Sequence, residues 1–186
     1  MTARFFVVSG PSGAGKGTLV SAVRQARPDL GLTVSATTRS PRPGEVDGVS
    51  YSFKSDDEFD AMVEAGEFLE WAHVAGHRYG TPLSEVERVL ASGRSLILEV
   101  DVQGGLNVKR LVDDAVLIFI EPPSFEELER RLRGRGTESD EDVALRLGQA
   151  AGEMALAPSY DARIVNDDLS RATADLLATV EAFESE

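Results

Sequence analysis

The strongest chemical signal in the chain is a glycine-rich segment near its start. It follows an apolar stretch over residues 5–9 and opens a helix-like pattern, the context that a phosphate-binding loop requires. Glycines let the backbone wrap a phosphate group with its N–H groups turned inward, and the helix N-terminus adds partial positive charge. The segment reads Gly10-Pro11-Ser12-Gly13-Ala14-Gly15-Lys16-Gly17-Thr18. Lys16 has the spacing to reach the β- and γ-phosphate oxygens of a nucleoside triphosphate, whereas Gly17 stands where the strict motif has a Mg²⁺-binding Ser or Thr.

A second anion site is indicated by Arg39 and Arg42, which lie in an acid-free segment over residues 35–44. Arginine forks bind phosphate oxygens through paired hydrogen bonds. The Pro and Gly turns of the segment would hold them in place. An exposed polar loop with solvated arginines is the alternative.

Tyr51 and Tyr79 could each donate a phenolic O–H to an anion. Because Val49, Tyr51 and Phe53 alternate along one predicted strand, Tyr51 could equally be a packed core residue.

Three carboxylates lie in otherwise apolar, strand-like runs: Glu70 in FLEWA, and Glu99 and Asp101 in LILEVDV. A buried carboxylate is costly unless it has partners, which makes Glu70 a candidate for ligand recognition. Glu99 and Asp101 share one face of their predicted strand at its carboxyl end, where open α/β sheets bind ligands. Acids exposed at the sheet edge are the alternative for this pair.

Four arginines fall within six residues, at 130, 131, 133 and 135, and Arg146 follows on the next predicted helix. Arg130 and Arg131 have Glu126 and Glu127 at helical spacing, whereas Arg135 is flanked by two glycines. A hinged arginine suits a closing lid that reaches a transferring phosphoryl group, and a solvated basic turn is the alternative.

No metal site is predicted from the histidines. His73 and His77 are four apart, but Gly76 interrupts the helical pattern and a third ligand has no source nearby.

Composition narrows the class of protein. With 186 residues the chain is long enough for one domain, and 19 basic against 32 acidic side chains leave a net charge of −13. That charge argues against nucleic-acid and anionic-membrane partners. Neither a membrane span nor a signal peptide is evident, and there is no cysteine, so we expect a cytoplasmic protein.

Buried-strand runs alternate with helical patterns, which predicts an α/β fold with a mostly parallel sheet. Strands are expected over residues 5–9, 95–102, 115–120 and 163–166, and helices over 15–25, 125–132, from 139 onward and 169–183. The start Ser139-Asp140-Glu141-Asp142 resembles a capping box.

Residues 33 to about 80 break the alternation. They contain short strand patterns over 49–53 and 68–72 and a helix over 56–65. We interpret them as a small insertion on the α/β core.

Taken together, the motifs resemble those of guanylate kinases, which phosphorylate GMP to GDP with ATP. The likeness covers nearly the whole chain. Its specificity comes from the order and spacing of GPSGAGKGT, SATTRSPRPGEVDGVSYSF, EFLEWA, YGTP, LILEVDVQG, LRGRGTES and YDARIVNDDL. It implies one domain with a P-loop core (about 1–35 and 89–186), a GMP-binding subdomain (about 36–88) and a helical lid (about 131–148).

The resemblance also implies roles for single residues. The ATP phosphates would be held by residues 10–18, with Lys16 on the transferring group, and Asn166 would lie near the adenine. The GMP phosphate would be held by Arg39, Arg42, Tyr51 and Tyr79, with Glu45 in support. Guanine would be contacted by Ser35, Glu70 and Thr81. Asp101 would lie near GMP and the Mg²⁺ water shell, and the lid arginines would be Arg135 and Arg146.

The function we expect is therefore ATP-dependent phosphorylation of GMP, with Mg²⁺. Two alternatives remain: a kinase for another small phosphorylated substrate, and a non-catalytic guanylate-kinase-like module that binds phosphopeptides. Glu70 together with Ser35 and Thr81 argues against the first, and the intact lysine-containing loop argues against the second.

Overall fold

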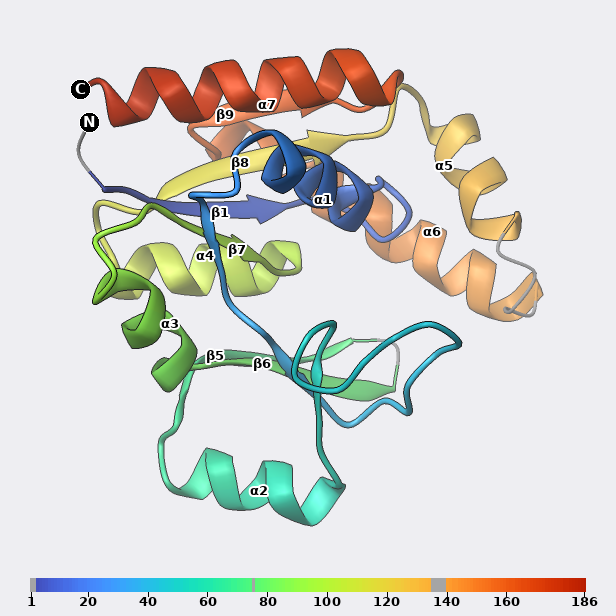
Figure 1. Cartoon of the computed structure of the whole chain (residues 1–186). Helices are drawn as coiled ribbons and strands as arrows, with labels where there is room; N and C mark the ends of the chain where they lie inside the picture. Colours follow the sequence, from blue (N-terminus) through green and yellow to red (C-terminus); the bar gives the residue numbers. More distant parts are fainter. Residues whose placement is uncertain (1–2, 75, 135–139) are drawn as a thin grey trace.

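A five-stranded parallel sheet forms the centre of the molecule (Figure 1). The computed structural model describes residues 3–74, 76–134 and 140–186. The strand order is β2 (Gly31–Leu32), β7 (Leu96–Glu99), β1 (Phe5–Ser9), β8 (Val116–Glu121) and β9 (Ala162–Val165). Every neighbouring pair in this sheet is parallel, so helices must make the crossovers. The predicted α/β class is confirmed.

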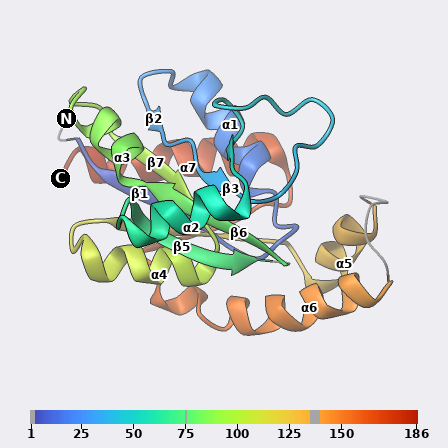
Figure 2. The same cartoon turned by 90° about the horizontal axis from the view of Figure 1, so that it is seen from below.

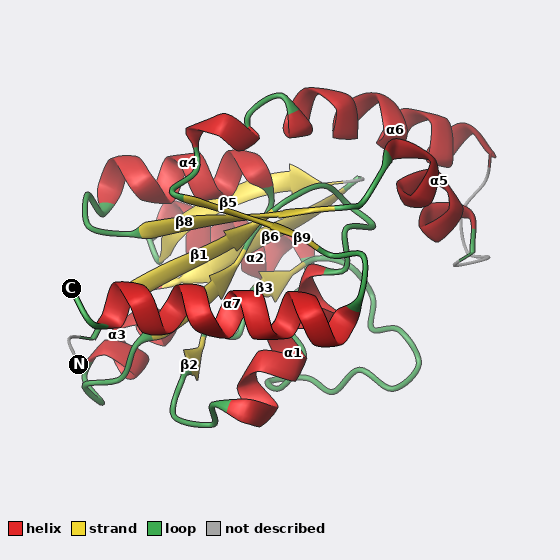
Figure 3. Ribbon diagram, turned by 90° about the horizontal axis from the view of Figure 1, so that it is seen from above, coloured by secondary structure: helices red, strands yellow, loops and turns green. Residues whose placement is uncertain are grey.

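Helices cover both faces of this sheet (Figure 3). Helices α1 (Lys16–Ala26) and α7 (Leu169–Glu184) lie on one face, and α4 (Val102–Leu111) lies on the other. Successive side chains of a strand point to opposite faces. Phe6 and Val8 of β1 therefore pack in the core cluster of α1 and α7, whereas Phe5 and Val7 pack in the cluster that contains α4.

The strand predicted over 95–102 is shorter in the structure, because a helix begins sooner than the pattern indicates. Strand β7 ends at Glu99, and Asp101 is the N-cap of α4, where its carboxylate accepts from the Gly104 N–H at 2.8 Å. An N-cap carboxylate satisfies a helix N–H that would otherwise lack a partner. Asp101 is thus held by a helix start and does not continue the strand of Glu99.

The insertion is a small mixed sheet below the core, with α2 (Asp56–Glu64) on its far side (Figures 1 and 2). Its order is β4 (Ser52–Phe53), β3 (Ala36–Thr37), β6 (His77–Pro82) and β5 (Phe68–Val74). Phe59 of α2 is fully buried and stacks on Phe68 at 4.6 Å between ring centroids. This packing attaches the helix to the sheet.

Two details of the insertion differ from the prediction. The strand expected over 49–53 shrinks to 52–53, because the N–H groups of Val49 and Ser50 both donate to the Val46 carbonyl and form a turn. Helix α3 (Leu83–Leu90), which follows β6, was not predicted at all. It packs through Val86 and Val89 into the same core cluster as α4.

Helices α5 (Phe125–Arg133) and α6 (Asp140–Met154) form a separate unit beside the core. Leu128 and Leu132 of α5 pack against Val143 and Ala150 of α6 in their own buried cluster. A short 3-10 turn, η1 (Ala157–Ser159), follows α6. Arg135 and Ser139, predicted as a hinged arginine and a helix cap, lie outside the described residues. Among the described helices, none has the length and apolarity to cross a membrane.

Candidate functional site

A cavity of about 370 Å³ lies between the carboxyl ends of the core strands and the smaller sheet. It brings together segments that are far apart in the sequence. Its lining comes from the glycine-rich loop, the insertion, the end of β7 and helix α6: Gly10, Ser12, Gly13, Gly15, Lys16, Gly17, Ser35, Arg42, Tyr51, Glu70, Ala72, Val74, Tyr79, Gly80, Glu99, Val100, Asp101, Arg146, Gln149 and Glu153.

The glycine-rich loop has the backbone shape that its sequence predicts. Gly13 and Gly15 adopt φ angles of 93° and 88°, in the region that favours glycine, and α1 starts directly after Gly15. The Lys16 ammonium folds over the loop and donates to the carbonyl oxygens of Gly10 at 2.6 Å and Pro11 at 3.2 Å. Thr18 is exposed and does not line the cavity.

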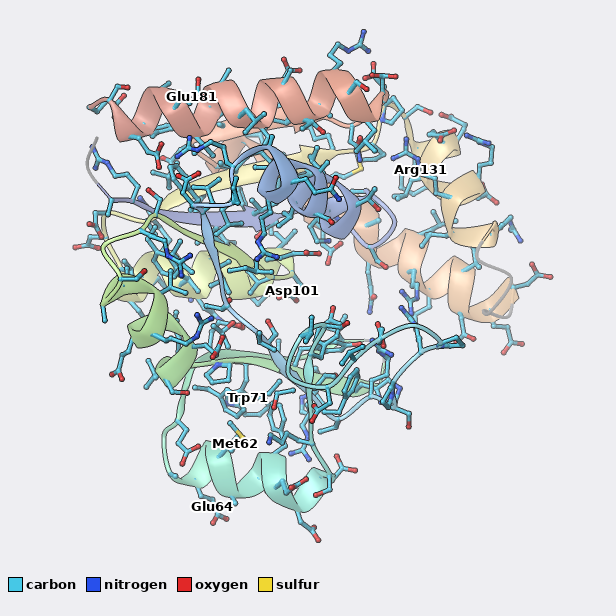
Figure 4. All side chains as sticks on the ribbon, in the orientation of Figure 1. Met62, Glu64, Trp71, Asp101, Arg131 and Glu181 are labelled. Carbon is cyan, nitrogen blue, oxygen red and sulfur yellow. The ribbon has the colours of Figure 1, made fainter. Side chains whose placement is uncertain are left out.

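Two side chains from distant segments support this loop. The Asn166 amide donates to the Ala14 carbonyl at 2.8 Å and is buried. Arg131 donates to the Asn166 carbonyl at 2.9 Å and to the Glu127 carboxylate at 2.8 Å (labelled in Figure 4). The sequence identified the Glu127 pair of Arg131 but not its position beside the loop, because that position depends on where α5 packs.

Arg130 and Arg146, two other arginines singled out in the sequence, have different partners in the structure. Arg130 pairs with Glu127, three residues before it, and not with Glu126 as the four-residue spacing indicated. Arg146 of α6 reaches the loop and donates to the Ser12 hydroxyl at 2.8 Å. Helix α6 therefore brings a guanidinium to the glycine-rich loop.

Arg39 is held firmly and is only 9% exposed. It donates to both carboxylate oxygens of Glu45, at 3.0 and 2.8 Å, and to the Tyr79 hydroxyl at 3.2 Å. The Arg39 guanidinium keeps the pKa of Glu45 below its usual value. For Arg39 the solvated-loop alternative is wrong, whereas Arg42 is exposed and lines the cavity.

Tyr51 is packed against its neighbours and also lines the cavity. Its ring packs edge-on against Tyr79 at 5.9 Å, with the Arg39 guanidinium 5.4 Å from its centroid, yet the residue lines the cavity. Burial raises the pKa of Tyr51 to about 12, so at neutral pH the phenol keeps its proton as a donor.

Glu70 is buried and accepts a hydrogen bond from the Thr81 hydroxyl at 2.8 Å. Its other oxygen, Oε2, points toward Gly104 at the start of α4. If Gly104 carried a Cβ atom, that atom would lie 2.9 Å from Glu70 Oε2 and 2.8 Å from Asp101 Oδ1. Burial raises the pKa of Glu70 to about 7, with a further contribution from Asp101. Its hydrogen-bond partner is thus a hydroxyl group, and no ion pair between Glu70 and an arginine occurs among the described residues.

Two further acids, Glu99 and Glu153, lie near enough to Lys16 to interact with its charge. The Glu99 carboxylate lies 3.5 Å from where a Cβ would stand on Gly17, and burial raises the pKa of Glu99 while Lys16 opposes the rise. Glu153 lies on α6, seven residues after Arg146, and burial raises its pKa as well. Sequence reasoning missed Glu153, although its spacing from Arg146 places both residues on one helix face.

His73 and His77 are exposed, and the described residues contain no group of three His, Cys, Asp or Glu side chains able to hold a metal ion.

Comparisons with known proteins identify the family of the chain. The family model described as guanylate kinase matches residues 2–183. The chain is 53% identical over 168 residues to the guanylate kinase of Thermosynechococcus vestitus (90% of this chain, 88% of the relative). It is 51% identical to that of Rubrobacter xylanophilus (94% and 91%).

Among solved structures, the crystal structure of guanylate kinase from Anaplasma phagocytophilum superimposes with a TM-score of 0.83 at 32% identity, and it covers all of this chain and 88% of its own. With the family model matched over nearly the whole length and relatives at about half identity, the chain belongs to the guanylate kinase family.

Proposed function

We propose a specific division of roles among the cavity residues in the guanylate kinase reaction. The chain phosphorylates GMP to GDP with ATP as co-substrate. One observation carries the assignment: the glycine-rich loop, the Arg39–Arg42–tyrosine group and the buried carboxylate of Glu70 all belong to a single site. Such a site has room for two phosphate groups that face each other.

On the donor side, the loop N–H groups and Lys16 bind the ATP phosphates. Arg131 and Asn166 keep the loop in shape through their contacts around Ala14. Arg146 already touches the loop at Ser12, so it can approach the transferring group with little movement. Arg135 stays a candidate for the same task. Helices α5 and α6, with their own small core, would move together as the lid.

On the acceptor side, Arg42, Tyr51 and Tyr79 face the cavity and would bind the GMP phosphate. Arg39 lies behind Tyr79 and would add positive charge near the GMP phosphate, and Glu45 fixes the orientation of the Arg39 guanidinium. Guanine presents two adjacent donors, N1–H and the N2 amino group, that match the two oxygens of Glu70. Thr81 holds one of these oxygens, and Ser35 lies on the same cavity wall.

The reaction needs no general base, because the GMP phosphate is already anionic at neutral pH. Catalysis consists of alignment for in-line transfer and stabilisation of the charge on the γ-phosphoryl group. Exclusion of water around the closed site would limit hydrolysis of ATP.

Mg²⁺ fits the acids at the end of β7. Mg²⁺ in kinases is held by one or two carboxylates together with phosphates and water, so a cage of three acids is not needed. Glu99 beside Gly17 and Asp101 at the start of α4 are placed to bind its water shell, which suits a loop that has glycine in place of the hydroxyl ligand. When bound, the ion would neutralise phosphate charge.

Because both substrates are metabolites of the cytoplasm, we propose that the enzyme acts in the cytoplasm.

The test is a coupled assay of ADP formation with ATP and a panel of nucleoside monophosphates, run on the wild type and on Lys16→Met. We expect GMP to be the preferred acceptor and kcat to fall by about two to four orders of magnitude in the folded variant. Preference for another monophosphate would support the general small-substrate kinase. Phosphopeptide binding without turnover would support the non-catalytic module.

A further inference from the structure

The chain passes between the core and the smaller sheet twice, and one ion pair joins the two connections. The first connection is residues 33–35, between β2 and β3. The second runs through α3, between β6 and β7 (Figures 1 and 2). Any change in the position of the smaller sheet relative to the core must therefore involve both segments.

The pair is Glu85 and Arg88, one turn apart on α3. Arg88 Nη2 donates to Glu85 Oε2 at 2.8 Å, and Arg88 Nε donates to Glu85 Oε1 at 3.1 Å. The same two side chains hold the backbone of the first connection. The Val34 N–H donates to Glu85 Oε2 at 3.0 Å, and Arg88 Nη2 donates to the Leu32 carbonyl at 3.1 Å.

Thr33 lies between these two anchored backbone groups. Its hydroxyl is buried and has no hydrogen-bond partner among the residues that the structure describes. A segment held by its own side chain would not leave a buried hydroxyl unpaired. The Thr33 hydroxyl therefore does not hold this connection, whereas Glu85 and Arg88 form hydrogen bonds with the backbone on either side of it.

Both connections end on the acceptor side of the cavity. Ser35 follows Val34 directly, lines the cavity and accepts through its carbonyl from the Ser52 N–H at 2.9 Å. Tyr79 and Thr81 lie on β6, immediately before α3. The ion pair therefore links the segment that carries Ser35 to the one that carries Tyr79 and Thr81.

We propose that Glu85 is a positioning residue for GMP, which acts with Arg88 to fix the connection that leads into Ser35 against α3. Pairing of β3 with β6 sets the register of the strands themselves. When the residues that contact a ligand already have a fixed position, less conformational entropy is lost on binding. The proposal rests on the proposed function in that GMP is the ligand of this wall. It involves neither the phosphate-binding loop nor α6, so the ATP half of the site is independent of it.

The kinetic test compares Glu85→Ala with Glu87→Ala, which removes an exposed glutamate from the same helix. Loss of a hydrogen bond to a charged group changes an equilibrium constant by about tenfold or more, so we expect KM for GMP to rise about tenfold in Glu85→Ala. KM for ATP should stay within about a factor of two of the wild type, because the donor side is untouched. Glu85→Gln keeps an acceptor for the Val34 N–H and should recover most of the GMP affinity.

A second measurement needs no substrate. Hydrogen exchange at the Val34 amide should speed up by about tenfold or more in Glu85→Ala and stay at the wild-type rate in Glu87→Ala. If Glu85→Ala folds poorly, Arg88→Ala replaces it in both experiments, because it removes the partner of Glu85 and the donor to the Leu32 carbonyl.

The proposal is wrong if Val34 exchange does not change, or if it accelerates while KM for GMP keeps its wild-type value. Equal rises in the KM values for GMP and ATP would also overturn it, because they indicate a general structural defect. A wild type that does not phosphorylate GMP would refute the proposed function instead, and the exchange experiment would still decide whether Glu85 holds the connection.

Discussion

Replacing Glu70 with glutamine should make the protein more stable and less selective at the same time. The carboxylate is 9% exposed, and burial raises its pKa from 4.5 to about 7. An acid whose pKa is higher in the folded state destabilises that state when it ionises. This cost is absent below pH 4.5, grows between pH 4.5 and 7, and is complete above pH 7.

The size of this effect follows from the shift. A rise from 4.5 to about 7 corresponds to about 3 kcal/mol at 1.36 kcal/mol per pKa unit. Glutamine is nearly isosteric, cannot ionise and still offers an oxygen to the Thr81 hydroxyl. In urea unfolding at pH 8, Glu70→Gln should therefore gain up to about 3 kcal/mol over the wild type, and the gain should shrink toward zero at pH 4.5.

The same substitution should damage recognition of guanine. Each hydrogen bond to a charged acceptor contributes about 1.5–3 kcal/mol, and the glutamine NH₂ would oppose one of the two guanine donors. We expect kcat/KM for GMP to fall about 100-fold, with little change in KM for ATP. AMP presents an unprotonated N1 and no N2 amino group, so its kcat/KM should not fall, and the GMP-to-AMP ratio should fall by about the same factor.

The pH profile supplies an independent check. Only ionised Glu70 accepts from both guanine donors, so KM for GMP in the wild type should rise about tenfold per pH unit below pH 7. The GMP phosphate itself titrates near pH 6, and Glu70→Gln isolates that contribution because its side chain does not titrate. A folded Glu70→Gln protein with wild-type stability at pH 8 and unchanged selectivity would refute the whole argument.

Three further outcomes are expected. Arg131→Ala removes the hydrogen bond that joins α5 to the Asn166 carbonyl, and should raise KM for ATP while KM for GMP stays near wild type; steady-state kinetics measure both, and a GMP-specific defect would contradict the assignment. Thr33→Val removes a buried hydroxyl with no partner among the described residues and should increase the free energy of unfolding by about 1 kcal/mol; a loss of stability in urea titration would show that this hydroxyl is satisfied. Gly10→Ala should destabilise the fold by about 3 kcal/mol or more, because its Cβ would overlap the Ile120 carbonyl oxygen, and thermal unfolding would show the loss; an unchanged Tm would mean that the loop adapts without cost.

Much of the protein could be predicted from the sequence because the signals are local. The apolar run over 5–9, the glycine spacing before Lys16 and the onset of helical periodicity are properties of adjacent residues, and they specify the glycine-rich loop with its strand and helix. The central strands also show in the sequence, since strands buried on both faces read as continuous apolar runs. The break in this alternation after residue 33 marked the inserted subdomain.

Only the tertiary structure decided how the predicted residues act. Asp101 looked like the end of a strand, but it caps α4. For Arg39 the sequence left a solvated loop open as an alternative, but the residue is buried against Glu45 and Tyr79. Arg131, Glu153 and the Glu85–Arg88 pair had no distinguishing signal, because their importance comes from residues distant in the sequence. Val34, the partner of Glu85, is 51 residues away, and Leu32, a partner of Arg88, is 56 residues away. Contacts of that range depend on how the two sheets and their helices pack together, and periodicity within a single segment carries no information about that packing.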